Sequence, residues 1–243
     1  MSQTKTITHE QFQKITEYLK KKKNASLLAI QISYYAGLRI GEVAGLSWND
    51  VNLEEQHLTI RRSLNRNSTR HKLELVATKS NKVRIVDFGD TLAEILRKAK
   101  KEQLKQRLQY GELYKRNYYK EVKEKNRIHY ELYSLDGTQQ VPEDYKEISL
   151  VCVRKDGMYL GTDALSNMCS SIAKHVDGLE HFHFHLLRHT FTSNLLASGA
   201  PPKDVQELLG HSAVSTTMNI YAHATREAKR NSVRLLDKVA GND

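Results

Sequence analysis

The sequence predicts a mainly α-helical α+β protein that contains a small antiparallel β-sheet. Helical hydrophobic patterns cover most of residues 8–46 and everything after residue 162, and three short alternating segments lie between them. Hydrophobic residues make up 39% of the 243 residues and charged residues 27%, as in ordinary globular chains, which excludes disordered and fibrous classes.

The N-terminal part is expected to be helical. Thr8, with Gln11 three residues later, has the capping-box pattern, and Phe12 follows with helical spacing. Further helices are expected over Ala25–Ala36, which Gly37 would end, and over Ile40–Leu46.

The middle of the chain carries the strand signals. The segments Leu58–Arg61, Leu73–Ala77 and Val83–Val86 alternate apolar and polar residues and predict one small antiparallel sheet. A long basic helix should follow Thr91 and be interrupted near Gly111. The stretch 117–142 carries no pattern that assigns a structure, and 148–153 is expected to be another strand.

The last third is expected to be helical throughout, with Pro202 at a first helical position and Gly210 as a helix end. The predicted helices cover 162–175, 186–197, 203–209, 216–222 and 226–239. Neither an internal repeat nor a strong domain boundary is visible in the sequence.

Charge points to a polyanionic partner. The chain has 38 Lys and Arg against 28 Asp and Glu, a net charge of +10. Residues 91–130 hold twelve of the basic residues against five Glu, interleaved with tyrosines, and a second basic cluster covers 61–84. Solvated helix faces could explain one such run, but two clusters favour contacts with a nucleic-acid backbone. The candidates are Arg61, Arg62, Lys82, Arg84, Lys115 and Arg116.

Other classes are disfavoured. The sequence lacks an apolar run long enough for a membrane span, and its first ten residues lack the apolar core of a signal peptide. Cys152 and Cys169 are too few for a disulfide framework and do not have metal-ligand spacing. We therefore expect a protein of the cytoplasm.

Individual candidates for chemistry each have a plain structural explanation. Arg39, between two helices, could be an ion-pair residue, His211 a cap and Tyr221 a core aromatic. His185 and Arg188 share one helix face with His189, a set that suits a phosphate better than a metal because a third acidic or Cys ligand is not nearby in sequence.

Taken together and in order, these residues resemble the tyrosine recombinase family, in particular the catalytic domain of phage and conjugative-transposon integrases. The resemblance extends from about Thr8 to Tyr221 and the helix after it. It rests on the blocks Ala36–Glu42, Thr78–Arg84, His185–Phe191, Leu208–His211 and Tyr221. It implies the tyrosine recombinase catalytic-domain fold over residues 1–225.

The resemblance implies a role for each block. Tyr221 would attack a DNA phosphodiester and form a 3′-phosphotyrosyl link, with His185 as general base. Arg39 and Arg188 would clamp the non-bridging oxygens, and His211 would hydrogen-bond the transition-state phosphate. A phenol with a pKa near 10 needs such help at neutral pH.

A lysine on a β-hairpin protonates the leaving 5′-oxygen in this family. Lys79 is preferred to Lys82 for this role because of its spacing from Arg84. Glu42 matches a mainly structural acidic position, and His189 is a conditional member of the pocket. The resemblance implies that the reaction needs no cofactor, metal or ATP.

The implied function is site-specific recombination for integration and excision of a mobile element. A chromosome or plasmid dimer resolvase would use the same chemistry, and a non-catalytic DNA-binding module is the alternative from another class. The implied partners are double-stranded recombination sites, a homotetramer formed on them, and an excisionase or host DNA-bending proteins. The implied location is the bacterial cytoplasm, at the nucleoid.

Relatives of this kind usually carry core-binding and arm-binding domains before the catalytic one, and the pattern here begins almost at Met1. We therefore expect the chain to be a fragment without those domains. Residues 226–243 are expected to form a C-terminal helix or tail that docks on a neighbouring protomer or packs on its own domain.

Overall fold

The protein consists of helices packed around two small antiparallel sheets. The computed structural model describes residues 6–67, 72–77, 83–124 and 127–210. The first helix, α1 (His9–Lys21), begins at the predicted cap. The Thr8 hydroxyl accepts from the Gln11 amide at 3.1 Å, and the Gln11 side chain accepts from the Thr8 amide at 2.9 Å. This reciprocal cap fixes the start of the helix.

The next two helices are joined by a tight turn. Helix α2 (Ser26–Ala36) ends at Gly37, whose φ of 65° is left-handed, and α3 (Ile40–Ala44) starts three residues later. A Cβ on Gly37 would lie 2.4 Å from the Phe191 ring, so only glycine fits this turn. The predicted helices at 25–36 and 40–46 are confirmed to within two residues.

The strands form two sheets, where the sequence predicted one. The first sheet has the order β1 (Val51–Asn52), β2 (His57–Ile60), β5 (Arg84–Asp87). The second has the order β3 (Arg62–Arg66), β4 (Leu73–Ala77), β7 (Arg127–Leu135), β6 (Arg116–Glu124), β8 (Tyr145–Glu147). All pairings are antiparallel.

The division into two sheets occurs at Arg61. Side chains of consecutive strand residues normally point to opposite faces, yet Arg61 and Arg62 both reach Asp50, with N–O distances of 2.7 and 2.8 Å. The backbone therefore leaves regular strand geometry between β2 and β3. The expected strand at 148–153 is also wrong, because this segment makes only isolated bridges, Ser47 to Leu150 and Val153 to Tyr159.

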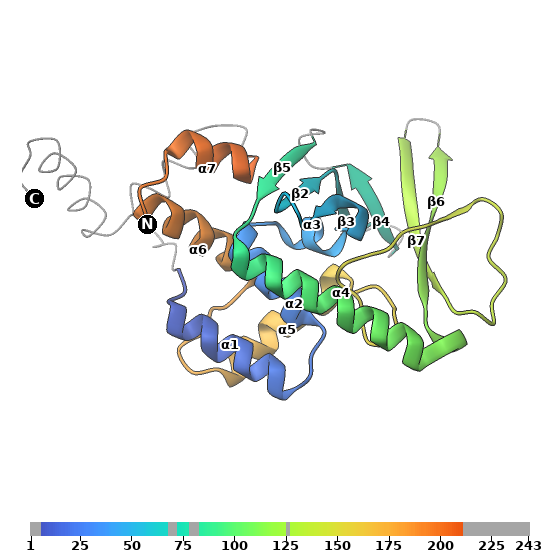
Figure 1. Cartoon of the computed structure of the whole chain (residues 1–243), viewed down its shortest axis with the longest axis horizontal. Coiled ribbons are helices and arrows are strands. Elements are labelled where there is room, and N and C mark those ends of the chain that lie inside the picture. Colours follow the sequence, from blue (N-terminus) through green and yellow to red (C-terminus); the bar gives the residue numbers. More distant parts are fainter. Residues whose placement is uncertain (1–5, 68–71, 78–82, 125–126, 211–243) are drawn as a thin grey trace, which may run out of the picture.

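The long basic helix is confirmed as α4 (Asp90–Tyr110), and it ends at Gly111, where φ is 53°. The stretch that the sequence left unassigned forms most of the β6–β7 hairpin, in which Tyr118 pairs with Tyr133 and Val122 with His129. In Figure 1 this hairpin stands at one end of the molecule.

Three helices complete the described chain: α5 (Thr162–His175), α6 (Phe184–Ala197) and α7 (Pro202–Leu209). They confirm the predictions, including Pro202 in the first turn of α7 and Gly210, with φ 64°, at its end. The predicted helices at 216–222 and 226–239 lie outside the described residues.

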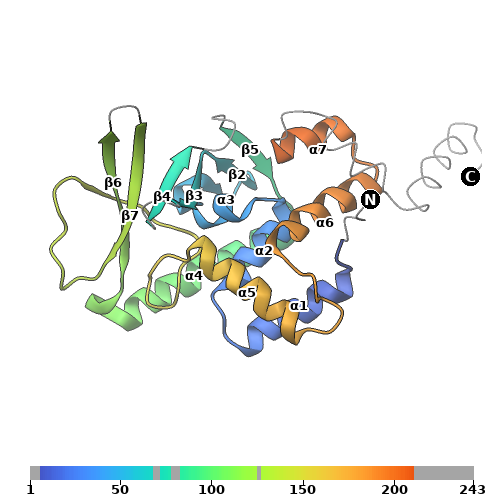
Figure 2. The ribbon, with the colours of Figure 1, turned by 180° about the vertical axis from the view of Figure 1, so that it is seen from behind.

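The core lies where the helices meet the sheets. Figures 1 and 2 show the strands along one side, α1 and α5 along the other, and α2 and α4 between them. Fully buried residues such as Ile30 of α2, Leu58 of β2, Leu96 of α4 and Ile172 of α5 belong to one hydrophobic cluster. Among the described helices, none is long and apolar enough to cross a membrane.

Candidate active site

The turn between α2 and α3 positions the first predicted site residue. Arg39 is the N-cap of α3; its amide donates to Glu42 Oε2 at 2.9 Å and its Nη1 to Oε1 at 3.0 Å. Its side chain stays 35% exposed. Arg39 is therefore both an ion-pair residue and a cation with solvent access, and the two roles suggested by the sequence are compatible.

Arg84 lies on the other side of the same carboxylate. Its Nη1 and Nη2 donate to the two oxygens of Glu42 at 2.9 and 2.8 Å, and its Nε donates to the Leu208 carbonyl at 3.1 Å. The side chain is only 12% exposed. The forked face of Arg84 is thus turned to Glu42, and its predicted contact with the DNA backbone stays a prediction.

Glu42 is buried between these two cations, with 3% of its surface exposed. Burial alone would raise the pKa of its carboxyl, but the hydrogen bonds and charge of Arg84, followed by those of Arg39, lower this pKa to about 2. Glu42 is thus a permanent anion at neutral pH and orients both guanidinium groups.

Arg188 of α6 is almost completely buried, with 2% exposed. Its Nη1 donates to the Gly37 carbonyl and its Nη2 to the Leu209 carbonyl, both at 2.7 Å. These carbonyls end α2 and α7, where the helix dipoles are negative, so they offset part of the cost of burying the cation. Burial, and then the charge of Arg39, lowers the pKa of Arg188 to about 9, which leaves it protonated at neutral pH.

His185 lies one turn before His189 on α6, and the two rings meet edge to face with centroids 4.5 Å apart. Partial burial, followed by the charges of His189, Arg188 and Arg39, lowers the pKa of His185 to about 4. The pKa of His189 is also lowered, first by burial. His185 is therefore neutral at pH 7, which is the protonation state from which a general base acts.

Three predicted catalytic residues, Lys79, His211 and Tyr221, lie outside the described residues, as does Lys82. The structure brings together the other three, Arg39, His185 and Arg188. It also adds Arg84, whose pairing with Glu42 the sequence did not reveal. The signal available in the sequence was only its place in the Thr78–Arg84 block.

The remaining basic candidates lie in two places. Arg61 and Arg62 share the buried carboxylate of Asp50. Lys115 and Arg116 follow the C-terminal end of α4, where β6 begins. Lys115 Nζ lies 3.9 Å from a carboxylate oxygen of Asp156, and Arg116 Nη1 lies 3.9 Å from one of Glu147.

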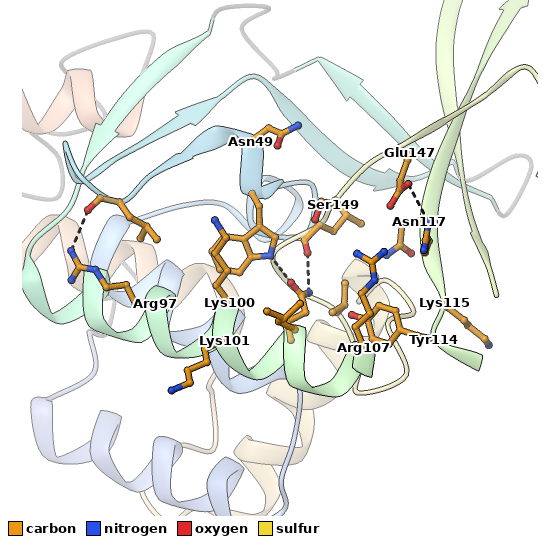
Figure 3. Close-up of a pocket in the computed structure, with 17 residues that line it drawn as sticks. Asn49, Arg97, Lys100, Lys101, Arg107, Tyr114, Lys115, Asn117, Glu147 and Ser149 are labelled. Atoms are coloured by element: carbon orange, nitrogen blue, oxygen red, sulfur yellow. Dashed lines mark hydrogen bonds and ion pairs between the residues drawn. The ribbon is translucent and has the colours of Figure 1, made fainter. Parts of the chain in front are cut away.

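Lys115 and Arg116 line a hollow of about 690 Å³ beside α4 (Figure 3). Further basic side chains of this hollow come from α4 itself, namely Arg97, Lys100, Lys101 and Arg107. Figures 1 and 2 place this end of α4 away from α6 and α7. The hollow is therefore a basic surface separate from the catalytic candidates.

Sequence comparison finds recombinases among the proteins that are similar to this chain. A tyrosine recombinase XerC-like protein of Caldanaerobacter subterraneus subsp. tengcongensis is 27% identical over 246 residues, covering 97% of this chain and 54% of the relative. The transposase from transposon Tn916 of Enterococcus faecalis is 28% identical over 235 residues, covering 96% and 51%. The chain spans about half the length of the curated relatives it matches.

Solved structures share the fold. The Tn1549 transposon integrase in complex with transposon right end DNA superposes with a TM-score of 0.68 at 21% identity, covering 97% of this chain and 67% of that one. The catalytic domain of bacteriophage HP1 integrase gives 0.52 at 18% identity, with 98% of both chains covered. The model of the family described as "Phage integrase family" matches residues 5–228, nearly the whole sequence. The chain therefore belongs to the phage integrase family.

Proposed function

We propose that this protein is a site-specific DNA recombinase that cuts and rejoins DNA through a 3′-phosphotyrosyl intermediate on Tyr221. One observation carries the proposal: two guanidinium groups, Arg39 and Arg188, lie beside a histidine, His185, whose pKa is lowered to about 4. This is the set that a phosphodiester needs, with cations for the developing charge and a neutral base for the nucleophile.

In the proposed cleavage step, the Tyr221 oxygen attacks phosphorus and the bond from phosphorus to the 5′-oxygen breaks. His185 accepts the phenolic proton, while Arg39 and Arg188 bind the non-bridging oxygens. A guanidinium has five N–H groups. Arg188 uses two of them for the Gly37 and Leu209 carbonyls, which leaves the others for a phosphate.

Lys79 is proposed to donate a proton to the departing 5′-oxygen, and His211 to hydrogen-bond the phosphate. Rejoining is the reverse reaction: a 5′-hydroxyl attacks the phosphotyrosine and releases Tyr221. The covalent link conserves the energy of the broken bond, so the scheme requires no ATP, cofactor or metal.

The proposed substrate is a pair of double-stranded recombination sites held by a tetramer of the protein in the bacterial cytoplasm, at the nucleoid. Two solved relatives, the Tn1549 integrase and a XerH recombinase, were bound to element or recombination-site DNA. The backbone contacts are proposed for Arg61, Arg62, Lys82, Lys115 and Arg116. Docking of residues 226–243 on a neighbouring protomer, and an excisionase or DNA-bending partner, are part of the same proposal.

Integration and excision of a mobile element is the role that we favour. The Tn916 transposase aligns over 96% of the chain, and the Tn1549 integrase gives a TM-score of 0.68 against 0.61 for XerA. The XerC-like relative, aligned over 97%, supports the alternative role in dimer resolution. Cleavage of element ends, compared with cleavage of a chromosomal dimer-resolution site, decides between the two roles.

The test of the chemistry is covalent trapping. Nicked suicide duplexes that carry candidate element ends are incubated with the wild-type protein and with Tyr221→Phe, and DNA binding is measured on the same duplexes. We expect a denaturation-resistant protein–DNA adduct with the wild type only. An adduct with Tyr221→Phe would contradict the assignment of the nucleophile, and binding without any adduct would favour the non-catalytic DNA-binding module.

A further inference from the structure

We propose that Arg84 is a positioning residue of the cleavage reaction, which holds the end of α7 against the Glu42–Arg39 pair. The inference rests on the proposed function. Arg84 is the first residue of β5, Glu42 lies in α3, and Leu208 lies in the last turn of α7. One side chain thus joins three elements that are far apart in the sequence.

The contacts of Arg84 leave little freedom. The two terminal nitrogens bind both oxygens of Glu42, and Nε donates to Leu208 O at 3.1 Å. This fork-to-fork geometry fixes the plane of the guanidinium as well as its position. Because Glu42 also accepts from Arg39, a displacement of Arg84 would move the carboxylate that orients Arg39.

The end of α7 depends on two arginines. The last four carbonyls of a helix lack intrahelical partners. Here the Gly210 amide donates to the carbonyls of Gln206 and Glu207, Arg84 donates to Leu208, and Arg188 donates to Leu209. The final turn of α7 is thereby held from β5 on one side and from α6 on the other.

Gly210 shows how close this approach is. Its φ of 64° is left-handed, and a Cβ at this position would lie 2.8 Å from Arg84 Cδ. The stem of Arg84 therefore packs directly on the residue that precedes His211, the predicted phosphate-binding histidine. Arg84 therefore fixes the position of Gly210, the residue at which α7 ends.

Arg84 differs from Arg39 and Arg188 in what it can do. Its face is covered by Glu42 and it is largely buried, so its effect on the reaction acts through the residues that it holds. A misplacement of about 1 Å in a reacting group can cost about 100-fold in rate. We expect Arg84→Ala to lower the rate constant for cleavage by about this factor.

The test compares Arg84→Ala, Arg84→Lys and the double variant Glu42→Gln/Arg84→Met with the wild type. The measurements are the single-turnover cleavage rate at saturating protein, the Kd for the same duplex, and the thermal midpoint. Lys14→Ala is the matched control, because it also removes a cation from an ion pair, but Lys14 pairs with Glu10 on the surface of α1, away from the site. It should cleave like the wild type.

We expect Arg84→Ala to bind DNA with unchanged Kd but to cleave about 100-fold more slowly. Arg84→Lys should cleave faster than Arg84→Ala but more slowly than the wild type. Its ammonium can pair with Glu42, but it lacks the planar guanidinium that also donates to the Leu208 carbonyl. The double variant removes the buried charges together, so its thermal midpoint should return toward that of the wild type while its cleavage stays slow.

Two results would overturn the inference. If the double variant regained the cleavage rate along with stability, Arg84 would be only the charge partner of Glu42. If Arg84→Ala weakened the Kd and left the saturated rate unchanged, Arg84 would be a DNA-backbone contact after all. If instead the proposed recombinase function were wrong, the wild-type protein itself would form no adduct on a duplex that it binds. That result is distinct from both outcomes above, in which the wild type cleaves.

Discussion

Arg188 donates a hydrogen bond of 2.7 Å to the carbonyl of Gly37, a residue 151 positions earlier in the chain. The bond joins α6 to the end of α2 and ties the buried cation to a residue two positions before Arg39. The left-handed turn at Gly37 ends α2 and also orients the carbonyl that holds Arg188.

We predict that Arg188→Met lowers the rate of cleavage by about 100-fold or more and lowers the free energy of unfolding by about 2–6 kcal/mol. Methionine retains most of the side-chain volume, but two carbonyls lose their donor, and each such loss costs about 1–3 kcal/mol. Urea unfolding measures the stability, and covalent trapping measures the cleavage. Cleavage at the wild-type rate by a folded Arg188→Met protein would show that Arg188 does not bind the phosphate.

The Glu42 carboxyl should make stability depend on acid. Its folded pKa of about 2 lies below its ordinary value of 4.5, so the folded state holds its proton less tightly than the unfolded state. The stabilisation is therefore complete above about pH 4.5 and is lost as the pH falls through 2. It amounts to about 3 kcal/mol from the size of the shift.

The measurement is urea unfolding of the wild type and Glu42→Gln at pH 7, 4 and 3. The wild type should be more stable than Glu42→Gln at pH 7, and the difference should shrink between pH 4.5 and 2. Other carboxyls titrate in both proteins and cancel in this difference. A constant difference across this range would mean that the carboxylate form of Glu42 is not what stabilises the fold.

The lowered pKa of His185 predicts the pH dependence of its protonation. In the free protein its imidazole should titrate near pH 4, well below the ordinary 6.5, because of burial and the neighbouring positive groups. As a general base it is then unprotonated from about pH 5 upward. The acid limb of kcat/KM should lie below pH 5, with no step near 6.5 from this residue.

Histidine NMR titration, with His185→Gln to assign the signal, measures this pKa directly. Cleavage kinetics between pH 5 and 8 provide the second reading. A midpoint near 6.5 in both experiments would contradict the environment described for His185, whereas a low midpoint with unaltered cleavage by His185→Gln would remove its role as base.

Local signals made much of the fold predictable from the sequence. The cap at Thr8, Pro202 in the first turn of α7 and the glycines at 37 and 210 mark helix ends within a few residues, so the helices could be located. Strand β3 could not be predicted, because Leu64 is the only apolar residue of the strand. The strand forms by pairing with β4, where Leu64 lies opposite Leu75.

The β6–β7 hairpin and the role of Arg84 required the tertiary structure. Tyrosines and charged residues occur along both strands of the hairpin without a clean alternation, and Tyr118 faces Tyr133 only through the register of the pair. Arg84 and Leu208 are 124 residues apart, so no local pattern joins them. The resemblance located Arg39, His185 and Arg188 but could not tell which carbonyls and carboxylate hold them.

The basic surface beside α4 leads to a prediction about salt. If Lys115 and Arg116 bind backbone phosphates, log Kd should rise steeply with log salt, and Lys115→Glu/Arg116→Glu should reduce that slope by about 0.9 for each phosphate that the protein no longer neutralises. The loss of affinity should be similar on specific and unrelated duplexes, because phosphates carry no sequence information.

Lys174→Glu, on the exposed side of α5, is a control for charge reversal alone. A loss confined to one DNA sequence would instead place these residues at base edges, and an unchanged slope would mean that the hollow in Figure 3 does not face DNA.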